Sequence, residues 1–458
     1  MTTDSATNRS EGTAAPPSDR RQSEFRFTRA AISATCEIEF GYRLDDGTEL
    51  VEHIAIPVAE PLSAARLEEL GALVDVLHWV AGVSYFKASV ADRLEFDGPR
   101  PTAAQAALIQ AIYSEGLGEF AYVNELDELP NPLIAGPPAE PRPQSPEAGT
   151  GSLVAIGGGK DSIVALAAAQ LTSGDRALFS VGDPVPIHAT AEVAGLPRLI
   201  ATRKLDPRLF ELNAEGAPNG HVPITAIVSL IGAITATANG FANVVMANER
   251  SASSGNVQHY GIDVNHQFSK GLRCERLLIA AIADSGTPVR YFSILRGASE
   301  LLIARAFAQL TEYHHAFTSC NTVFKIDERE RGTSWCGDCP KCRFVFLALA
   351  PFMTPDALVA IFGKNLLDDA ARYDEFARLA DVGGFKPFEC VGETDEAVAA
   401  FQLLAGQPAW SDAAVVRRFA EEVLKSAPHA DPAAQLAWSS DHEIPEEFEV
   451  AARELLGA

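Results

Sequence analysis

The chain has 458 residues, of which 47% are hydrophobic, and a formal net charge of −24 at pH 7. This length is enough for two or three domains, each with its own core. Proteins that bind duplex DNA or tRNA need basic surfaces to replace the counterions of the phosphates, so the acidic charge argues against a nucleic-acid partner.

The first part of the chain predicts a tail followed by a small domain. Residues 1–24 have no apolar segment after a basic start, so they predict a disordered tail rather than a secretion signal or membrane anchor, and we expect a cytoplasmic protein. Alternating apolar residues on both sides of Asp45-Asp46-Gly47 predict a β-hairpin. With helical periodicity over 64–80 and 103–115, residues 25–128 predict an α+β domain.

A proline-rich segment at 129–151 predicts an extended linker, after which strands and helices alternate. Strands are expected at 152–156, 177–182, 243–248 and 289–295. This alternation predicts an α/β domain at 152–350 with a mainly parallel sheet, helices on both faces and a ligand crevice at the carboxyl ends of the strands.

Two further segments complete the predicted organisation. The apolar residues 222–246 are interrupted by proline, glycine and asparagine, which favours a buried helix and strand over a membrane span. Residues 351–458 predict a C-terminal helical subdomain.

Three consecutive glycines, Gly157, Gly158 and Gly159, lie where the first predicted strand of the α/β domain ends and a helix begins. Glycine lets backbone N–H groups approach an anion closely, and the positive end of a helix favours negative charge. The loop fits neither a Walker motif, because Asp161 follows Lys160, nor a dinucleotide fingerprint, because a serine replaces the last glycine. It therefore predicts a phosphate site of another type, with a ligand-free turn as the alternative.

Four cysteines lie close together in the sequence, and three others, Cys36, Cys274 and Cys390, stand alone. The four are Cys320, Cys336, Cys339 and Cys342. Four thiolates on short loops favour a closed, structural zinc site. A redox pair or unliganded thiols are the alternative.

A polar segment follows the strand predicted at 243–248, where substrate contacts belong. Its predicted substrate-binding residues are Glu249, Arg250, Gln267 and Lys270. The basic residues gathered here, which include Arg273 and Arg276, favour a small anionic substrate, although surface ion pairs are the alternative for these two arginines. For the neighbouring His259 and His266, a structural hydrogen bond is the alternative.

The glycine loop resembles the phosphate loop of the PP-loop ATP pyrophosphatases, with Gly158, Gly159, Asp161 and Ser162 matching and Gly157 in place of a leading serine. The resemblance implies that residues 157–162 bind the β- and γ-phosphates of ATP. It also implies that Lys160 adds a positive charge near them and that Asp161 helps hold Mg²⁺. The cysteine segment is similar to the zinc-binding one of the 7-cyano-7-deazaguanine synthases, which belong to the same superfamily.

Several segments together resemble the ATP-dependent epimerases that convert UDP-N-acetylmuramoyl-L-alanyl-L-glutamate to its D-glutamate form. They are "IGGGKDSIVAL", "NERSASSGN" with "VNHQFSK", "WCGDCPKC" and "FKPFECVG", and the similarity spans about residues 25–404. It implies a PP-loop α/β fold, ATP and Mg²⁺ as cofactors, and a UDP-muramoyl dipeptide as substrate. From the cysteine segment we also expect structural Zn²⁺, and from the apolar pattern no membrane partner.

The resemblance also implies a mechanism. ATP converts the glutamate α-carboxylate into an acyl-adenylate, which makes the α-hydrogen more acidic; proton removal and return on the opposite face invert the centre, and water releases AMP. Lys160 and Asp161 are then expected to serve adenylation, and His266 and Lys270 the proton transfers, followed by His259 and Cys274. Glu249 is expected to orient a base or bind the adenylate ribose.

Two other functions stay open from the sequence. One is a different PP-loop ligase or thiolase, of the 7-cyano-7-deazaguanine synthase or tRNA-modification type. The other is a non-catalytic ATP-binding or zinc scaffold protein, against which the presence of Asp161 and Ser162 argues.

Overall fold

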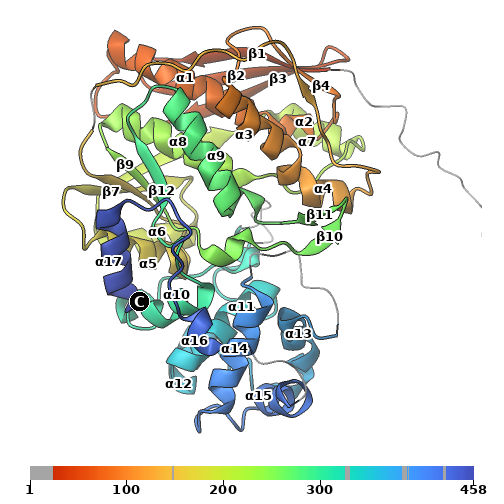
Figure 1. Ribbon diagram of the computed structural model, residues 1–458, viewed down its shortest axis with the longest axis vertical. Helices are drawn as coiled ribbons and strands as arrows, with labels where there is room; N and C mark the ends of the chain where they lie inside the picture. Colours follow the sequence, from red (N-terminus) through yellow and green to blue (C-terminus); the bar gives the residue numbers. More distant parts are fainter. Residues whose placement is uncertain (1–23, 147–148, 325–330, 384–388, 390, 426–429) are drawn as a thin grey trace, which may run out of the picture.

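The computed structural model describes residues 24–146, 149–324, 331–383, 389, 391–425 and 430–458. A ten-stranded sheet runs through this part of the chain in the order β12-β9-β6-β7-β8-β3-β2-β1-β4-β5 (Figure 1). Its strands are β1 (Glu24–Ile32), β2 (Glu37–Leu44), β3 (Glu49–Ala55), β4 (Arg93–Phe96), β5 (Leu133–Ile134), β6 (Ser152–Ala155), β7 (Arg176–Val181), β8 (Arg198–Lys204), β9 (Asn243–Met246) and β12 (Arg290–Ser293). A separate hairpin pairs β10 (Val257–His259) with β11 (Ile262–Val264).

Five strands, from β12 to β8, are parallel, which confirms the predicted parallel sheet. The chain starts at the central strand β6, continues to β7 and β8, and then crosses back to β9 and β12. The order of the strands therefore reverses between β6 and β9, and in such sheets ligands bind beside the carboxyl ends at that point. The predicted strands of this region correspond to β6, β7, β9 and β12, whereas β8 had not been predicted.

The N-terminal strands extend the same sheet rather than forming a separate one. β3 pairs antiparallel with β8 between residues 53–55 and 202–204. Beside this junction Arg203 Nε donates to Glu52 Oε1 over 2.6 Å, and the Glu52 side chain is fully buried. Strand pairing and a buried ion pair thus join the two halves of the sheet.

The predicted hairpin is present between β2 and β3, but the apolar stretch before it contains two strands rather than one. The chain turns at Cys36, which has a positive φ of 58°. Such a φ is uncommon for residues other than glycine, and no glycine marks the turn, so the alternation of apolar residues did not indicate it.

Alternate residues of the central strands face two separate hydrophobic cores, as the period of a strand requires. On one side, residues such as Leu153 and Val244 pack with helices of the N-terminal half and with α8 and α9. Figure 1 shows α1, α3, α8 and α9 along this face. The helices of this half are α1 (Ala64–Ala81), α2 (Val83–Phe86), α3 (Ala103–Tyr113), α4 (Gly118–Val123), α7 (Pro207–Ala214), α8 (Ile224–Asn239) and α9 (Leu272–Asp284). α1, α3, α8 and β9 confirm the helices and strand predicted for these segments.

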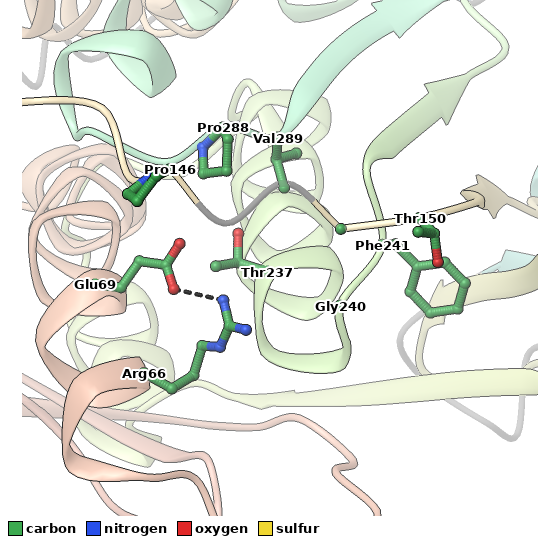
Figure 2. A pocket seen from close by; sticks show the side chains of 10 residues that line it. Arg66, Glu69, Pro146, Thr150, Thr237, Gly240, Phe241, Pro288 and Val289 are labelled. Carbon is green, nitrogen blue, oxygen red and sulfur yellow. Dashed lines mark hydrogen bonds and ion pairs between the residues drawn. The ribbon is translucent and has the colours of Figure 1, made fainter.

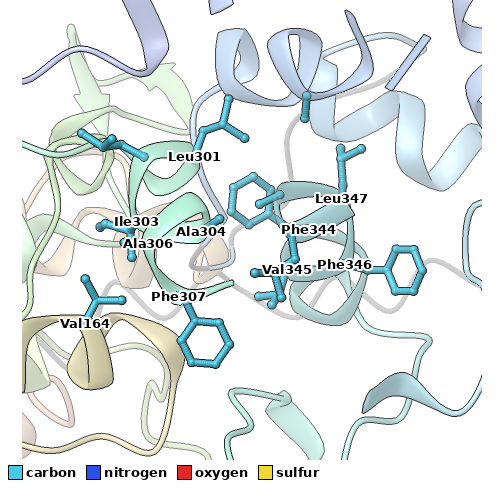
Figure 3. Close-up of a cluster of buried hydrophobic side chains, with 14 of the residues drawn as sticks. Val164, Leu301, Ile303, Ala304, Ala306, Phe307, Phe344, Val345, Phe346 and Leu347 are labelled. Atoms are coloured by element: carbon cyan, nitrogen blue, oxygen red, sulfur yellow. The ribbon is translucent and has the colours of Figure 1, made fainter. Parts of the chain in front are cut away.

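On the other side, Val154 and Val245 pack with a core that continues into the C-terminal helices. Figure 3 shows Val164, Phe307 and Phe346, from α5, α10 and α11, among the buried side chains that join these layers. The helices are α5 (Lys160–Ala169), α6 (Val185–Ala194), α10 (Glu300–Phe307), α11 (Pro340–Leu349), α12 (Pro355–Phe362), α13 (Tyr373–Ala377), α14 (Thr394–Ala405), α15 (Ala414–Phe419), α16 (Pro432–Gln435) and α17 (Glu446–Leu456). The last of them, α17, returns to pack on α5.

No helix in the described part of the chain is both long and apolar enough to cross a membrane. The tail predicted for residues 1–24 lies, apart from Glu24, outside the described residues, and so does Cys390.

Candidate functional site

The glycine loop joins the carboxyl end of β6 to the start of α5, as predicted. Gly158 has a φ of 79°, and a Cβ there would lie 2.8 Å from the carbonyl carbon of Pro186, so only glycine fits. α5 begins after Gly159, which has no side chain to cap the helix. The first N–H groups of a helix are the groups that bind anions at helix N-termini.

Three carboxylates meet beside this loop. Asp161 follows β6, Glu249 follows β9 and Glu300 follows β12, and one oxygen of each lies within 4.8 Å of the others. These strands are neighbours in the sheet, so their carboxyl ends bring together residues that are far apart in the sequence. Glu300 had not been predicted, although it lies soon after the strand expected at 289–295.

The electrostatics of this cluster favour a cation. Burial raises the pKa of Glu249 and that of Glu300, and the charge of Asp161 raises both further. Burial disfavours the charge of Lys160, but its contacts with Asp161 and Glu300 outweigh that effect and raise its pKa. Lys160 thus pairs with two of the three carboxylates, and carboxylate oxygens are the ligands that Mg²⁺ prefers.

A buried arginine holds the polar segment against the end of β12. The Arg296 guanidinium, 1% exposed, binds the buried Glu275 carboxylate through Nε at 3.0 Å and Nη2 at 2.6 Å. It also donates to the backbone oxygens of Glu249 and Lys270. Arg296 thereby fixes the backbone of two predicted site residues.

Replacing Arg296 with methionine is expected to destabilise the protein by about 3–5 kcal/mol, because the Glu275 charge would stay buried without its partner. Urea unfolding followed by circular dichroism measures this loss. Arg276→Met is the matched control, since the Arg276 side chain is 49% exposed and pairs with Asp441 and Glu443 at the surface. Equal losses in both variants would contradict the role assigned to Arg296.

A carboxylate from the C-terminal helices supports Glu300. Glu396, on α14, accepts hydrogen bonds from the Glu300 N–H and the Ser251 hydroxyl, both over 2.7 Å. Its side chain therefore holds the start of α10 beside the segment that follows β9.

A second group of titratable side chains lies around the predicted His266. Glu119 of α4 hydrogen-bonds His266 Nδ1, and the same carboxylate oxygen lies 3.9 Å from His221 Nδ1. The two imidazole rings are 4.4 Å apart between centroids. Sequence reasoning missed Glu119 and His221, because each lies in a different part of the chain and no local spacing connects either of them with His266.

Lys270 lies near both groups. Its charge opposes the burial effect on Glu249 and lowers the pKa of His221. Its ammonium donates to the Gln267 side chain over 3.5 Å. The structure thus brings together Lys160, Asp161, Glu249, His266, Gln267 and Lys270 of the predicted site.

The remaining candidates from the polar segment point elsewhere. Arg250 binds the Gln435 side chain, Arg273 pairs with Glu115, and Arg276 forms the surface ion pairs described above. His259 is exposed and packs against Tyr122 and Tyr260. Cys274 is buried in a hydrophobic core, and burial raises the pKa of its thiol to about 12, which does not suit a base.

The four predicted cysteines converge, and none of them is in a disulfide. Sγ–Sγ distances are 3.9 Å for Cys320–Cys339, 3.7 Å for Cys336–Cys342 and 3.4 Å for Cys339–Cys342. Four sulfurs at about 2.3 Å from a tetrahedral zinc would lie about 3.8 Å apart. The cluster also adjoins the glycine loop, because the Thr318 N–H donates to the Gly158 carbonyl over 3.0 Å.

A cavity of about 560 Å³ opens at the other end of the parallel strands (Figure 2). Thr150, Phe241 and Val289, which precede β6, β9 and β12, line it together with the ion pair of Arg66 and Glu69. It therefore lies at the amino ends of the strands, away from the carboxylates and the histidines.

The parallel sheet, the glycine loop and the carboxylates at the strand ends define an α/β protein with a cluster of polar side chains where the strand order reverses. Residues 17–294 match the family model described as the MurL N-terminal domain, and residues 316–434 match the MurL C-terminal domain. The chain belongs to the MurL family.

Three relatives are each named UDP-N-acetyl-alpha-D-muramoyl-L-alanyl-L-glutamate epimerase. The Micromonospora sp. protein is 48% identical over 89% of this chain and 92% of its own length. The Salinispora tropica protein is 44% identical over 89% of this chain and 90% of its own length. The Xanthomonas oryzae pv. oryzae protein is 42% identical over 93% of this chain and 96% of its own length. No solved structure matches the chain significantly.

Proposed function

We propose that this protein is an ATP-dependent epimerase that converts the terminal L-glutamate of UDP-N-acetylmuramoyl-L-alanyl-L-glutamate to D-glutamate, in the synthesis of peptidoglycan precursors. The names of three relatives that align over most of the chain support the substrate and the epimerisation. The observation that carries the chemistry is the convergence of Asp161, Glu249 and Glu300 beside the glycine loop.

The glycine loop and the start of α5 would bind the pyrophosphate part of ATP. The N–H groups at the start of a helix attract phosphate, and Gly158 allows the backbone to approach it closely. Ser162 Oγ donates to the Gly159 carbonyl over 2.9 Å and so holds the shape of the loop. The resemblance of this loop to that of the PP-loop pyrophosphatases supports cleavage between the α- and β-phosphates.

The carboxylate cluster fits Mg²⁺. Asp161, Glu249 and Glu300 would hold the ion, since their negative charges repel one another and their carboxylates offer oxygen ligands. When bound, Mg²⁺ neutralises phosphate charge during attack on the α-phosphate. Lys160 would then keep Asp161 and Glu300 in place and add positive charge beside the phosphates.

Forming the acyl-adenylate removes the negative charge of the α-carboxylate. Without it, the carbanion formed by removal of the α-hydrogen no longer lies next to a carboxylate, so the hydrogen becomes more acidic. His266 and Lys270 would remove and return this proton. Inversion needs one proton-transfer group within reach of each face of the carbon. Water would then release AMP from the inverted product.

The cysteine cluster fits a structural Zn²⁺. Its four sulfurs would fill all four positions, leaving none for substrate. The ion would fasten the segment at Thr318 against the glycine loop.

The decisive experiment incubates the protein with ATP, Mg²⁺ and the L-glutamyl UDP-muramoyl dipeptide in D₂O. We expect D-glutamyl product with deuterium at the α-carbon, together with AMP and pyrophosphate. Nuclear magnetic resonance measures the deuterium, and chiral analysis of the glutamate released by hydrolysis measures the inversion. Ion-exchange chromatography measures AMP and pyrophosphate.

Release of ADP and phosphate would refute the proposed cleavage of ATP. Turnover to AMP with no deuterium at the α-carbon would refute the epimerisation and leave a PP-loop ligase or thiolase. Omitting the dipeptide serves as the control for background hydrolysis of ATP.

A further inference from the structure

The cluster of Glu119, His221 and His266 adds two residues, Glu119 and His221, to the predicted His266. Glu119 comes from the N-terminal half, His221 from the segment before α8, and His266 from the turn after β11. Their side chains are 15%, 23% and 17% exposed, so all three are largely shielded from water. One carboxylate oxygen serves both imidazoles.

Tight packing holds these three segments together. A Cβ on Gly116 would lie 3.1 Å from the Pro223 side chain and 3.4 Å from that of Phe268, so the segments carrying Glu119, His221 and His266 touch at this glycine. Lys87 adds a further link, because its ammonium donates to the Asn219 side chain and to the Gly220 carbonyl. These contacts fix the three segments, and with them the cluster, relative to one another.

The chemistry of the cluster is that of a proton carrier. A carboxylate at Nδ1 of His266 directs a proton to that nitrogen and leaves Nε2 to accept another. Burial above all, together with nearby positive charge such as that of Lys270, lowers the pKa of His221 to about 4. At neutral pH His221 is therefore an uncharged imidazole, and as a weak base it readily gives up a proton that it receives.

Lys270 connects this cluster with the carboxylates. Arg296 donates to the backbone oxygens of both Glu249 and Lys270 and so holds their segments side by side, while His266 lies only four residues before Lys270 in the segment between β11 and α9. A substrate whose carboxyl group is activated beside Glu249 would thus have the segment that carries His266 and Lys270 next to its α-carbon.

We propose that His221 and His266, held by Glu119, form a single proton-transfer unit that acts on one face of the glutamate α-carbon, while Lys270 acts on the opposite face. This inference rests on the proposed function. With centroids 4.4 Å apart, the two rings leave no room for a carbon centre between them, so they serve the same face. Glu119 is a positioning residue, supplied by the N-terminal half of the chain.

The proton balance of the step is complete. The neutral imidazole unit takes the α-hydrogen as a proton, and the C–H electron pair moves into the activated carbonyl group. The ammonium of Lys270 then donates a proton to the opposite face of the same carbon, and the carbonyl re-forms. The imidazolium loses its proton to water and the lysine amine regains one, so the enzyme returns to its first state without a co-reactant.

Two rates measured in parallel test this inference. One is ATP–pyrophosphate exchange, which reports adenylation; the other is deuterium entry from D₂O at the α-carbon of the L-dipeptide, with inversion scored separately. In His221→Asn and His266→Asn we expect the ratio of deuterium entry to ATP–pyrophosphate exchange to fall about 10²-fold or more. In Glu119→Gln the same ratio is expected to fall about 10- to 100-fold.

Lys270→Gln is expected to give the complementary result. The imidazole unit would still remove the proton and return deuterium to the same face, so the L-dipeptide gains deuterium while inversion is lost. His53→Asn is the control, because the His53 side chain is 58% exposed on β3. It should leave unchanged both the ratio of deuterium entry to ATP–pyrophosphate exchange and the extent of inversion.

The outcomes separate this inference from the proposed function. Wild-type protein without ATP–pyrophosphate exchange would refute the proposed function itself. Wild-type exchange with histidine variants that still epimerise normally would overturn only the inference. A stoichiometric divalent metal in the purified protein, lost in His266→Asn, would also overturn it by identifying the cluster as a metal site.

Discussion

Replacing Glu300 with glutamine is expected to lower the rate of ATP–pyrophosphate exchange about 10²- to 10³-fold, the size of effect seen when one preorganised charged or polar group is removed from a reacting centre. Glutamine keeps the shape of the side chain and its hydrogen bonding but removes the charge that meets Lys160 and Asp161. The affinity for Mg²⁺ should fall together with the rate. Initial rates measured over a range of Mg²⁺ concentrations separate the two effects.

Glu312→Gln is the matched control, since this glutamate is exposed in a short helical turn away from the cluster. It should leave the exchange rate and the Mg²⁺ dependence unchanged. If Glu300→Gln keeps the wild-type exchange rate at low Mg²⁺, Glu300 is not a ligand of the ion. Asp161 and Glu249 would then lack a third carboxylate partner.

If the four cysteines hold zinc as proposed, replacing Cys339 with serine is expected to abolish zinc binding and to lower the thermal midpoint by about 10 °C or more. Binding of structural zinc contributes on the order of 10 kcal/mol in small domains, and each kcal/mol shifts the midpoint by about 2–4 °C in domains of 150–250 residues. Zinc content by mass spectrometry of metals and unfolding by scanning calorimetry measure both effects.

Cys274→Ala distinguishes loss of metal from loss of packing. Cys274 is fully buried in the core on the other side of the sheet, so its replacement should cost stability without changing the zinc content. If Cys339→Ser keeps a full equivalent of zinc, the four cysteines are not its ligands.

The same cluster has a consequence for ATP. The Thr318 N–H holds the Gly158 carbonyl, and a Cβ on Gly159 would lie 3.3 Å from Ser319 Cβ, so the segment before Cys320 supports the glycine loop directly. The chain that leads into the cysteine cluster therefore packs directly against the loop of the proposed ATP site.

The C-terminal helices contribute to the site in a similar way. Glu396 accepts the N–H of Glu300 and the hydroxyl of Ser251, which places a carboxylate of α14 behind two of the strand-end segments. The site therefore depends on three parts of the chain: the sheet, the N-terminal half with Glu119, and α14.

Much of the parallel half of the fold could be predicted from the sequence, because its signals are local. Short buried strands alternate with amphipathic helices, and the glycines between β6 and α5 mark the turn that the chain must make there. The cysteine spacing likewise brings three of the four thiols together within one short segment. The turn at Cys36 and the strand β8 were missed, because a cysteine with positive φ and a strand with few apolar residues carry no such local signal.

The sequence by itself determined the α/β class, the glycine loop and the cysteine cluster, since each depends on the periodicity or spacing of residues close together in the chain. Only the tertiary structure decided which distant groups complete the site. Lys160 and Glu300 are 140 residues apart, and Glu119 and His266 are 147 apart. They meet because the sheet aligns the carboxyl ends of β6, β9 and β12 and because the N-terminal half packs beside them, which no local pattern records.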